Sequence, residues 1–212
     1  MPLDSCQDFL RSIDASEAEA ERFSAYDAAL VETSVHTNLV ARKSLPDRWE
    51  RHYADSAQLW PLLPDNAENA LDFGSGAGFP GMVMAIMCEE RRPALSWTLC
   101  DSVGKKAAFL AAVAQKAQLD RCQVLSGRVE SLARKKAYDL ITARAVTALP
   151  GLLELATPLL AIGGTMIFPK GQRAQQEVDA AREQWSFELE TVASQTDRDA
   201  AILVIRAPLR KP

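Results

Sequence analysis

The most constraining feature of this chain is a run of three glycines at alternate positions, Gly74, Gly76 and Gly78. A short apolar stretch at 70–73 precedes the run, and a proline-glycine step at 80–81 opens an apolar stretch with helical spacing. Because glycine has no Cβ, the backbone can turn sharply here and a ligand can approach it closely. The helix that follows presents free N–H groups and the positive end of its dipole to the same place. The run therefore predicts a strand–loop–helix unit that binds a nucleotide-like ligand.

Length and composition are those of an ordinary globular protein. The 212 residues are enough for one good-sized core, alone or with an appendage, and 48% of them are apolar while 25% are charged. No apolar run reaches the length of a membrane span, and no basic start followed by an apolar stretch opens the chain. None of the four cysteines belongs to a C-x-x-C pair, which favours reduced thiols over metal ligands or disulfides. We therefore expect a cytoplasmic protein that contacts no membrane and holds no metal.

The spacing of apolar residues divides the chain into two parts. The first third has helical spacing only, and no strand pattern is evident before residue 70. Beyond that point strands and helices alternate, which is typical of a parallel sheet with helices on both faces. We therefore expect an N-terminal helical appendage over 1–66 and an α/β domain over 67–212.

The expected elements can be given by residue range. The strand candidates are 70–73, 96–100, 123–125, 138–142, 165–168, 187–193 and 201–206. The helical candidates are 5–13, 16–36, 46–63, 81–90, 104–118, 128–135, 150–161 and 173–184. Gly163-Gly164 is expected to form the turn before the fifth strand. Only a polar stretch at 194–200 separates the last two strands, which is short enough for an antiparallel hairpin.

Charge is unevenly distributed along the chain. Residues 1–36 hold eight acidic and two basic side chains, whereas residues 37–212 hold twenty acidic and twenty-two basic ones. The net charge of −4 argues against a surface that coats nucleic acid. Lys105-Lys106 and the basic run 134–136 follow the second and third expected strands, and a solvated face is the plainer interpretation of each cluster.

Two common glycine loops do not match the run. A dinucleotide-binding loop reads G-x-G-x-x-G, and the sixth position counted from Gly74 is Phe79 instead. No G-K-[ST] follows, so the run is not a P-loop either. The second expected strand ends at Asp101, whose carboxylate could accept hydrogen bonds from both hydroxyls of a ribose. The alternative for Asp101 is an N-cap on the helix at 104–118, and the nearby glycine loop favours ribose binding.

The G-x-G-x-G spacing after Asp72 resembles the S-adenosylmethionine loop of class I methyltransferases. Their Rossmann-like fold has a mostly parallel seven-stranded sheet with an antiparallel C-terminal hairpin. Further stretches narrow the resemblance: Arg51-His52-Tyr53-Ala54-Asp55-Ser56, the loop 74–81, Asp101-Ser102-Val103-Gly104-Lys105-Lys106, Gly127-Arg128-Val129-Glu130, Ala143-Arg144-Ala145 and Lys170-Gly171. In this order they resemble the bacterial 16S ribosomal RNA guanine-N7 methyltransferase family RsmG (GidB, glucose-inhibited division protein B), from about residue 20 to the C-terminus.

This resemblance implies an enzyme that transfers a methyl group from S-adenosylmethionine to N7 of a guanine in 16S rRNA of the small ribosomal subunit. The positions that it implies for cofactor binding are Gly74, Gly76, Gly78, Phe79, Asp101, Val129, Glu130 and Arg144. The positions that it implies for substrate binding are His52, Arg128, Arg144 and Lys170. Arg144 is the implied catalytic residue, and we expect a monomer with no DNA partner.

The chain departs from the family pattern at a few positions. Ala143 and Val146 stand where the family commonly has a hydroxyl residue and an aromatic one. Asn38-Leu39-Val40 replaces an N-L-T step, and Pro169 precedes Lys170. These departures affect the finer contacts and leave the cofactor loop intact.

The implied chemistry needs few special residues. N7 of guanine bears no proton, so no strong general base is required, and alignment alone can contribute about 7–11 kcal/mol in favourable cases. A guanidinium such as that of Arg144 can hydrogen-bond guanine O6 or a phosphate, although a salt bridge is the plainer alternative. A chain of net charge −4 would bind naked RNA weakly, so we expect the substrate to be a folded ribonucleoprotein particle.

Other functions remain open from the sequence. A class I methyltransferase could act on another RNA or on a small molecule, with the helices of 1–63 as a lid over a small pocket. A non-catalytic, ribosome-associated binder could keep the same fold. A dinucleotide oxidoreductase is disfavoured because Phe79 stands where its third glycine would be.

Overall fold

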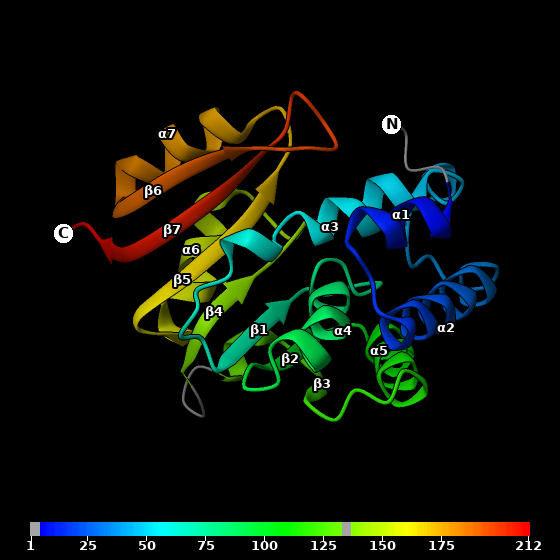
Figure 1. Cartoon of the computed structure of the whole chain (residues 1–212). Helices are drawn as coiled ribbons and strands as arrows, with labels where there is room; N and C mark the ends of the chain where they lie inside the picture. The colour runs from blue at the N-terminus through cyan, green and yellow to red at the C-terminus, as the bar shows by residue number, and fades with distance from the viewer. Residues whose placement is uncertain (1–4, 133–136) are drawn as a thin grey trace.

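The computed structural model describes residues 5–132 and 137–212 and is built around one seven-stranded sheet (Figure 1). The strands are β1 (Asn69–Phe73), β2 (Ser96–Asp101), β3 (Cys122–Ser126), β4 (Tyr138–Thr142), β5 (Leu160–Lys170), β6 (Trp185–Ala193) and β7 (Ala201–Arg210). They lie in the order β3-β2-β1-β4-β5-β7-β6. Neighbours are parallel as far as β5, and β7 pairs antiparallel with β5 and β6. This confirms the expected α/β class with an antiparallel C-terminal hairpin.

The order of the strands creates a topological switch point at the carboxyl ends of the inner strands β1 and β4. β2 and β3 extend the sheet on one side of β1, and β4 then pairs with the other side. Asp72 of β1 lies in register with Thr142 of β4, so the loops after these two strands begin side by side. In open α/β sheets such a switch point forms the crevice in which ligands bind. The loops at 74–80 and 143–148 therefore flank this switch point.

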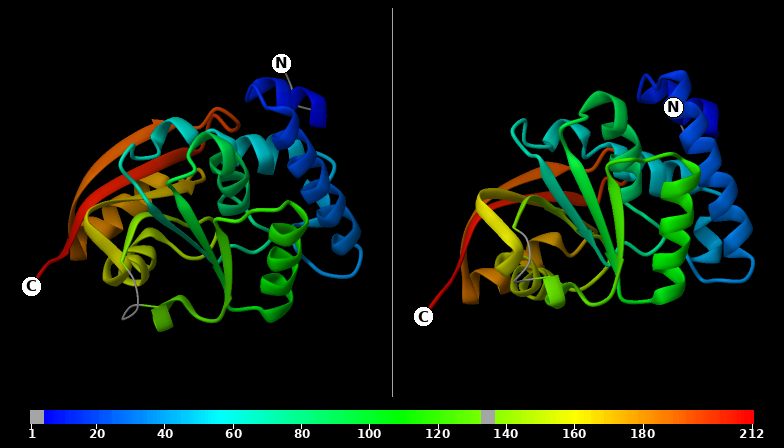
Figure 2. Two further views of the ribbon diagram at one scale, coloured as in Figure 1. Left: turned by 60° about the horizontal axis from the view of Figure 1, so that its bottom comes forward. Right: turned by 90° about the horizontal axis from the view of Figure 1, so that it is seen from below.

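Helices cover both faces of the sheet (Figures 1 and 2). They are α1 (Cys6–Ser12), α2 (Glu17–Ser34), α3 (Asp55–Ala57), α4 (Gly81–Arg91), α5 (Gly104–Lys116), α6 (Leu149–Ala156) and α7 (Ala174–Gln184). Because successive strand residues point to opposite faces, Ala70 joins the core beneath α4 and α5, while Leu71 joins the core beneath α6 and α7. Across residues 5–132 and 137–212, no helix combines the length and apolar character that a bilayer crossing requires.

The N-terminal helices pack on the face that α4 and α5 cover. Phe23 and Tyr26 of α2 are fully buried, and Tyr26 Oη donates a hydrogen bond of 2.7 Å to Ala77 O in the loop after β1. Glu19, 1% exposed, forms an ion pair of 2.6 Å with Arg91 at the end of α4. These helices therefore share one core with the sheet, and the division of the chain into two domains stays a prediction.

A sequence signal at Ser16 accounts for the start of α2. Ser16 Oγ accepts a hydrogen bond of 3.1 Å from Glu19 N, and the Glu19 carboxylate accepts one of 3.0 Å from Ser16 N. This reciprocal pair is a capping box, which satisfies two backbone donors that the first turn of a helix leaves free. Its spacing is visible in the sequence, and the structure confirms it.

The prediction of a single helix is wrong for the segment 46–63. This segment consists of a π-helix (Trp49–Ala54), the short α3 and a 3-10 helix (Trp60–Leu62). Pro61 and Pro64 have no backbone N–H, so they account for the end of the helical segment and not for the π-helix at its start. The apolar spacing identified the helical character but not the change of helix type.

Two other expected elements also differ. β5 begins at Leu160, and Gly163, with φ of +78°, lies inside it, so the Gly163-Gly164 pair forms an irregularity within the strand and not a turn before it. The expected helix at 128–135 begins as a 3-10 helix (Val129–Leu132). The rest of that expected helix and the whole basic run 134–136 lie outside the described residues.

Candidate functional site

Positive φ angles shape the loop after β1. Gly74, Gly76 and Gly78 have φ of +63°, +59° and +108°, a region that residues with a Cβ rarely adopt. A Cβ on Gly78 would lie 2.6 Å from Tyr26 Oη and 2.8 Å from Met82 Cβ. A Cβ on Gly76 would have only Gly74 O, at 3.8 Å, within 4 Å. Gly78 is thus required for packing, whereas Gly76 leaves an open backbone face that a ligand can approach.

The Asp101 carboxylate at the end of β2 supports this loop. Its Oδ2 accepts a hydrogen bond of 2.7 Å from Gly76 N, and its Oδ1 accepts one of 2.8 Å from Val103 N. Val103 is the N-cap residue of α5, so the capping interpretation of Asp101 is wrong. Each carboxylate oxygen keeps a lone pair that could accept from a ribose hydroxyl.

Asp72 lies at the floor of the crevice and is fully buried. Its Oδ1 accepts a hydrogen bond of 2.7 Å from Thr142 Oγ1, while its Oδ2 has no hydrogen-bond partner of good geometry among the described residues. Burial raises the pKa of Asp72 to about 6, and the Thr142 hydrogen bond and the charge of Arg144 oppose that rise. Asp72 therefore links β1 to β4 directly beneath the loop.

Arg144, just beyond β4, connects the glycine loop to the segment before the sheet. Its guanidinium carbon lies 5.3 Å from the centroid of the Phe79 ring, a cation–π contact. Nη1 donates hydrogen bonds to Asp55 Oδ2, at 2.8 Å, and to Arg51 O, at 3.3 Å. Nη2 lies 3.3 Å from His52 Nδ1. The salt bridge considered for Arg144 from its sequence context is therefore present, with Asp55 as the partner.

The His52 ring beside Arg144 is uncharged at neutral pH. It stacks on Phe79 with a centroid distance of 5.0 Å and an interplanar angle of 27°, and its Nε2 lies 2.9 Å from Ser44 Oγ. Burial, followed by the charges of Arg144 and Arg51, lowers the pKa of His52 to about 4. A neutral ring with its proton on Nε2 can accept a hydrogen bond from Arg144 through Nδ1.

The π-helix brings His52 and Asp55 to this place. Trp49 and Tyr53 are buried in the core, where their rings stack at a centroid distance of 4.3 Å. His52 lies inside the π-helix and Asp55 directly follows it, and both contact Arg144. One side of the segment thus anchors in the core while other residues reach the site. π-Helical turns are rare and frequently occur at functional sites.

The remaining predicted cofactor residues lie at the end of β3. Val129, 8% exposed, and Glu130, which is exposed, begin the 3-10 helix there, and Arg128 precedes them. Gly127 N donates a hydrogen bond of 2.9 Å to Asp101 O, which brings this turn beside the end of β2. Because β2 and β1 separate β3 from β4, the structure does not bring these residues together with Arg144.

The loop and its surroundings fit an adenosine-based cofactor. Gly76 offers open space to a ligand, and Asp101 offers acceptors at the end of the next strand. Two apolar side chains, Val103 (48% exposed) and Val146 (39% exposed), lie next to Asp101 and Gly74 and could cover a flat base or an alkyl chain. These properties match S-adenosylmethionine, which combines an adenosine with a sulfonium and a short amino-acid chain.

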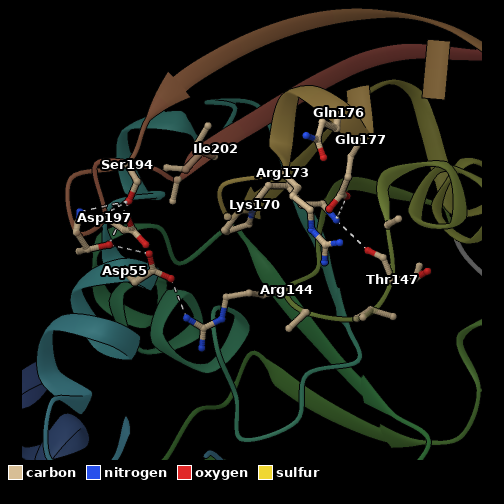
Figure 3. A pocket seen from close by; sticks show the side chains of 18 of the residues that line it. Asp55, Arg144, Thr147, Lys170, Arg173, Gln176, Glu177, Ser194, Asp197 and Ile202 are labelled. Carbon is tan, nitrogen blue, oxygen red and sulfur yellow. Dashed lines mark hydrogen bonds and ion pairs between the residues drawn. The ribbon is translucent and has the colours of Figure 1, made fainter. Parts of the chain in front are cut away.

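A cavity of about 1060 Å³ adjoins Arg144 at the carboxyl ends of β4 and β5 (Figure 3). Its lining comes from the loop after β4, the end of β5, the start of α7 and the β6–β7 loop. Lys170 lines it, with Nζ 2.8 Å from Thr147 O and 2.8 Å from the Glu177 carboxylate. The structure therefore places Lys170 at this cavity, next to Arg144 and apart from the residues at the end of β3.

Some residues of this cavity were not singled out from the sequence. Arg173 and Arg198 line it, and so does Thr196, whose Oγ1 donates a hydrogen bond of 2.8 Å to Asp55 Oδ1. Arg173 could have been identified from the sequence, because it follows Lys170 closely in the chain. Arg198 could not, because a charged residue in a polar loop does not by itself indicate a site. Within the described residues no group of three or more His, Cys, Asp or Glu side chains could hold a metal ion, and the four cysteines are free thiols.

Comparison with known proteins places these features in a family. The family model GidB, rRNA small subunit methyltransferase G, matches residues 19–201. The curated Ribosomal RNA small subunit methyltransferase G of Cereibacter sphaeroides is 41% identical over 198 residues, which are 93% of this chain and 95% of that protein. The protein of the same name from Acidiphilium cryptum is 44% identical over 183 residues, covering 85% and 82% of the two chains.

Solved structures of other proteins share the fold of this chain. The O-methyltransferase from Bacillus cereus in complex with SAH has a TM-score of 0.59 at 15% identity and covers 87% of this chain and 91% of its own. Aeropyrum pernix fibrillarin with natively bound S-adenosyl-L-methionine has a TM-score of 0.57 at 15% identity, covering 74% and 75%. The matched family model includes the glycine loop, Asp101 and Arg144, and curated relatives match along nearly the whole chain. The chain therefore belongs to the rRNA small subunit methyltransferase G family, as its motifs predicted.

Proposed function

We propose that this chain transfers a methyl group from S-adenosylmethionine to N7 of a guanine in 16S ribosomal RNA of the small ribosomal subunit. As a member of its family the chain is an rRNA methyltransferase that uses S-adenosylmethionine. The observation that supports the finer statement is the position of Arg144. It contacts Phe79 of the cofactor loop and also lines a cavity with basic side chains, so that it lies where cofactor and RNA would meet.

The cofactor would lie along the carboxyl ends of β1, β2 and β3. The open backbone face of Gly76 would allow its close approach, and Asp101 would accept hydrogen bonds from the ribose. Val129 and Glu130, at the end of β3, would flank the adenine. Phe79 would line the cofactor site together with Arg144, whose guanidinium it contacts.

When bound, S-adenosylmethionine supplies a methyl group to which the N7 lone pair of guanine forms the new bond, while the sulfur keeps the electron pair of the old one. N7 bears no proton, so the protein needs no general base. His52 is a weak base, because burial and the charges of Arg144 and Arg51 lower its pKa to about 4, and its ring nitrogens lie next to Ser44 and Arg144. The protein contributes alignment, which can lower the barrier by about 7–11 kcal/mol in favourable cases.

Arg144 would orient the target guanine. Its planar guanidinium could donate hydrogen bonds to guanine O6 or to a flanking phosphate and leave N7 free. Asp55 and His52 hold the guanidinium from the side of the N-terminal segment, which fixes its direction. Lys170 would contact the RNA from the cavity, and Arg128 would do so from the far edge of the cofactor site.

The chemistry of the target restricts the partner. N7 lies on the major-groove edge, which is inaccessible in an A-form helix, so the guanine would belong to an open or distorted loop. With a net charge of −4, the chain would recognise a folded small-subunit particle better than naked RNA. We further propose that it acts in the cytoplasm as a monomer, without a DNA or membrane partner. Residues 1–66 would form an appendage on the methyltransferase domain at 67–212.

The proposal can be tested on small ribosomal subunits from a strain that lacks the endogenous activity. The purified chain with S-adenosylmethionine should methylate their 16S rRNA, and mapping should find 7-methylguanine at one position. Methyl transfer to another RNA or to a small molecule would replace the proposed substrate. Binding of the subunit without methyl transfer would identify a non-catalytic ribosome-associated binder.

A further inference from the structure

The cavity beside Arg144 carries an excess of positive charge although the whole chain is acidic. Five basic and three acidic side chains line it, whereas the net charge of the chain is −4. All three acids already have partners. Asp55 pairs with Arg144 at 2.8 Å. Glu177 pairs with Lys170 at 2.8 Å, and Asp197 accepts a backbone hydrogen bond within its own loop. The remaining positive charge is therefore available to a ligand.

Two arginines supply much of that charge. Arg173 is the N-cap residue of α7, and Arg198 belongs to the β6–β7 loop. Both are exposed, and among residues 5–132 and 137–212 neither guanidinium has an ion pair or a hydrogen bond. An arginine fork without a protein partner at a concave surface is suited to bind a phosphate group.

The loop that carries Arg198 has a fixed position relative to Arg144. Gln195 N donates a hydrogen bond of 2.7 Å to Gln58 Oε1, next to the Thr196–Asp55 hydrogen bond. Asp55 binds Thr196 through Oδ1 and Arg144 through Oδ2, so one carboxylate supports both the loop and the arginine. Arg198 therefore extends from an anchored loop.

Lys170 adds a positive charge that is almost completely buried. Its side chain is 8% exposed, and its Nζ has Thr147 O and the Glu177 carboxylate as acceptors. An ammonium group carries three N–H donors. In the described part of the chain the third has no acceptor, and the residue lines the cavity, as Figure 3 shows.

We infer that this cavity binds the phosphodiester backbone of the substrate RNA next to the target nucleotide, through Arg173 and Arg198 and with Lys170 beneath them. The inference rests on the proposed function and adds a subsite to it. The volume of about 1060 Å³ lies at the upper end of the roughly 300–1,000 Å³ of ligand sites, so the cavity has room for a nucleotide and its phosphates. Phosphate contacts fix the register of a nucleic acid without reading its sequence. Arg173 and Arg198 would thus hold the RNA backbone beside Arg144 and contribute to the affinity for the subunit.

The test compares Arg173→Ala, Arg198→Ala and Arg121→Ala with the wild type on small ribosomal subunits. Arg121 is an exposed arginine before β3, at the amino end of the strands, and it provides a control with the same change of charge. The measurements are KM and kcat for the subunit, Kd as a function of salt concentration, and the affinity for S-adenosylhomocysteine. Thermal unfolding verifies that each variant is folded, and Arg173→Lys retains the charge at that position.

Each cavity variant should raise Kd and KM about three- to tenfold, since one charge-assisted hydrogen bond is lost. The slope of log Kd against log salt should decrease by roughly 0.7–0.9 per arginine. We expect kcat and the affinity for S-adenosylhomocysteine to stay at wild-type values, and Arg173→Lys to restore the salt slope. Arg121→Ala should match the wild type throughout.

The outcomes separate this inference from the proposed function. If the wild type methylates the subunit while Arg173→Ala and Arg198→Ala match Arg121→Ala, the phosphate subsite is wrong and the proposed function stands. If the wild type does not methylate the subunit, the proposed function fails, and unchanged Kd values for the variants would reject the subsite as well. Tight binding of inorganic phosphate that depends on Arg173, without any effect on RNA binding, would assign the cavity to a free phosphate ion.

Discussion

Asp55 and Arg144 form an ion pair of 2.8 Å although 89 residues separate them in the sequence. Both side chains are largely buried, with exposed fractions of 18% and 19%. The pair connects the π-helical segment before the sheet to the loop after β4, and Asp55 extends the connection to Thr196 in the β6–β7 loop. One carboxylate thus ties together three parts of the chain that surround the candidate RNA site.

We expect Asp55→Asn to lower kcat on the order of tenfold to a hundredfold, because the Arg144 guanidinium would lose the charge that directs it, and small misplacements are costly in catalysis. The affinity for S-adenosylhomocysteine, measured by calorimetry, should stay unchanged. Asp47→Asn is the matched control, since Asp47 is an exposed aspartate just before the same π-helix. Equal kcat values for the two variants would show that Asp55 does not position Arg144.

Arg144→Ala should reduce methyl transfer to small ribosomal subunits more than Asp55→Asn does, on the order of a hundredfold or more. Folding should remain intact, because the side chain is not part of either apolar core. Arg144→Lys should recover little activity, since an ammonium lacks the planar fork of donors. Turnover of the alanine variant at the wild-type rate would remove Arg144 from the site.

Gly78→Ala should mainly lose stability, whereas Gly76→Ala should mainly lose cofactor affinity. A methyl group at Gly78 would clash with Tyr26 and Met82, so its variant should lose roughly 2–5 kcal/mol of unfolding free energy. A methyl group at Gly76 meets open space, so its variant should lose only the left-handed strain of about 1–2 kcal/mol. The same methyl group would occupy the cofactor's place and weaken S-adenosylhomocysteine binding about tenfold or more.

Gly163→Ala is the control for this comparison. Gly163 also has a positive φ, +78°, with nothing within 4 Å of the added Cβ, and it lies in β5 outside the crevice. It should show the same strain as Gly76→Ala with normal cofactor affinity. If the variants at Gly76 and Gly163 bind S-adenosylhomocysteine equally well, the open face of Gly76 is not a cofactor contact.

Acid should destabilise the protein partly through His52. The pKa of His52 is about 4 in the folded state and 6.5 ordinarily, so between these values the unfolded chain binds the proton more readily. The contribution of neutral His52 to the free energy of unfolding is therefore complete above pH 6.5 and is lost as the pH falls from 6.5 to 4. The full loss corresponds to about 3 kcal/mol. Asp72 acts in the opposite direction, because its raised pKa of about 6 adds stability at low pH that is lost as the pH rises from 3.8 to 6.

The two contributions can be separated by denaturant unfolding of the wild type and His52→Gln between pH 4 and 8. The stability difference between them should shrink as the pH falls through the window from 6.5 to 4. His36→Gln, at an exposed histidine, is the control and should follow the wild type. Parallel curves for His52→Gln and the wild type would contradict the depressed pKa.

Much of the fold is readable from the sequence because its signals are local. Alternation of strands and helices, the capping box at Ser16 and the glycine run each depend on residues within one turn or one strand, and the structure confirms them. The motifs around Asp101 and Arg144 identified the family, which the comparisons confirm. The expected site residues remain predictions, although the structure shows where each of them lies.

The amino-acid sequence by itself determined the α/β class, the glycine loop and the family, because these depend on residue spacing along the chain. Only the tertiary structure decided that Asp55 and His52 meet Arg144, and that Arg173 and Arg198 share a cavity with Lys170. These contacts depend on the sheet order, which places β4 next to β1, and on a π-helix that apolar spacing does not reveal. Contacts between distant segments depend on how the elements pack, and short-range patterns of residues do not specify that packing.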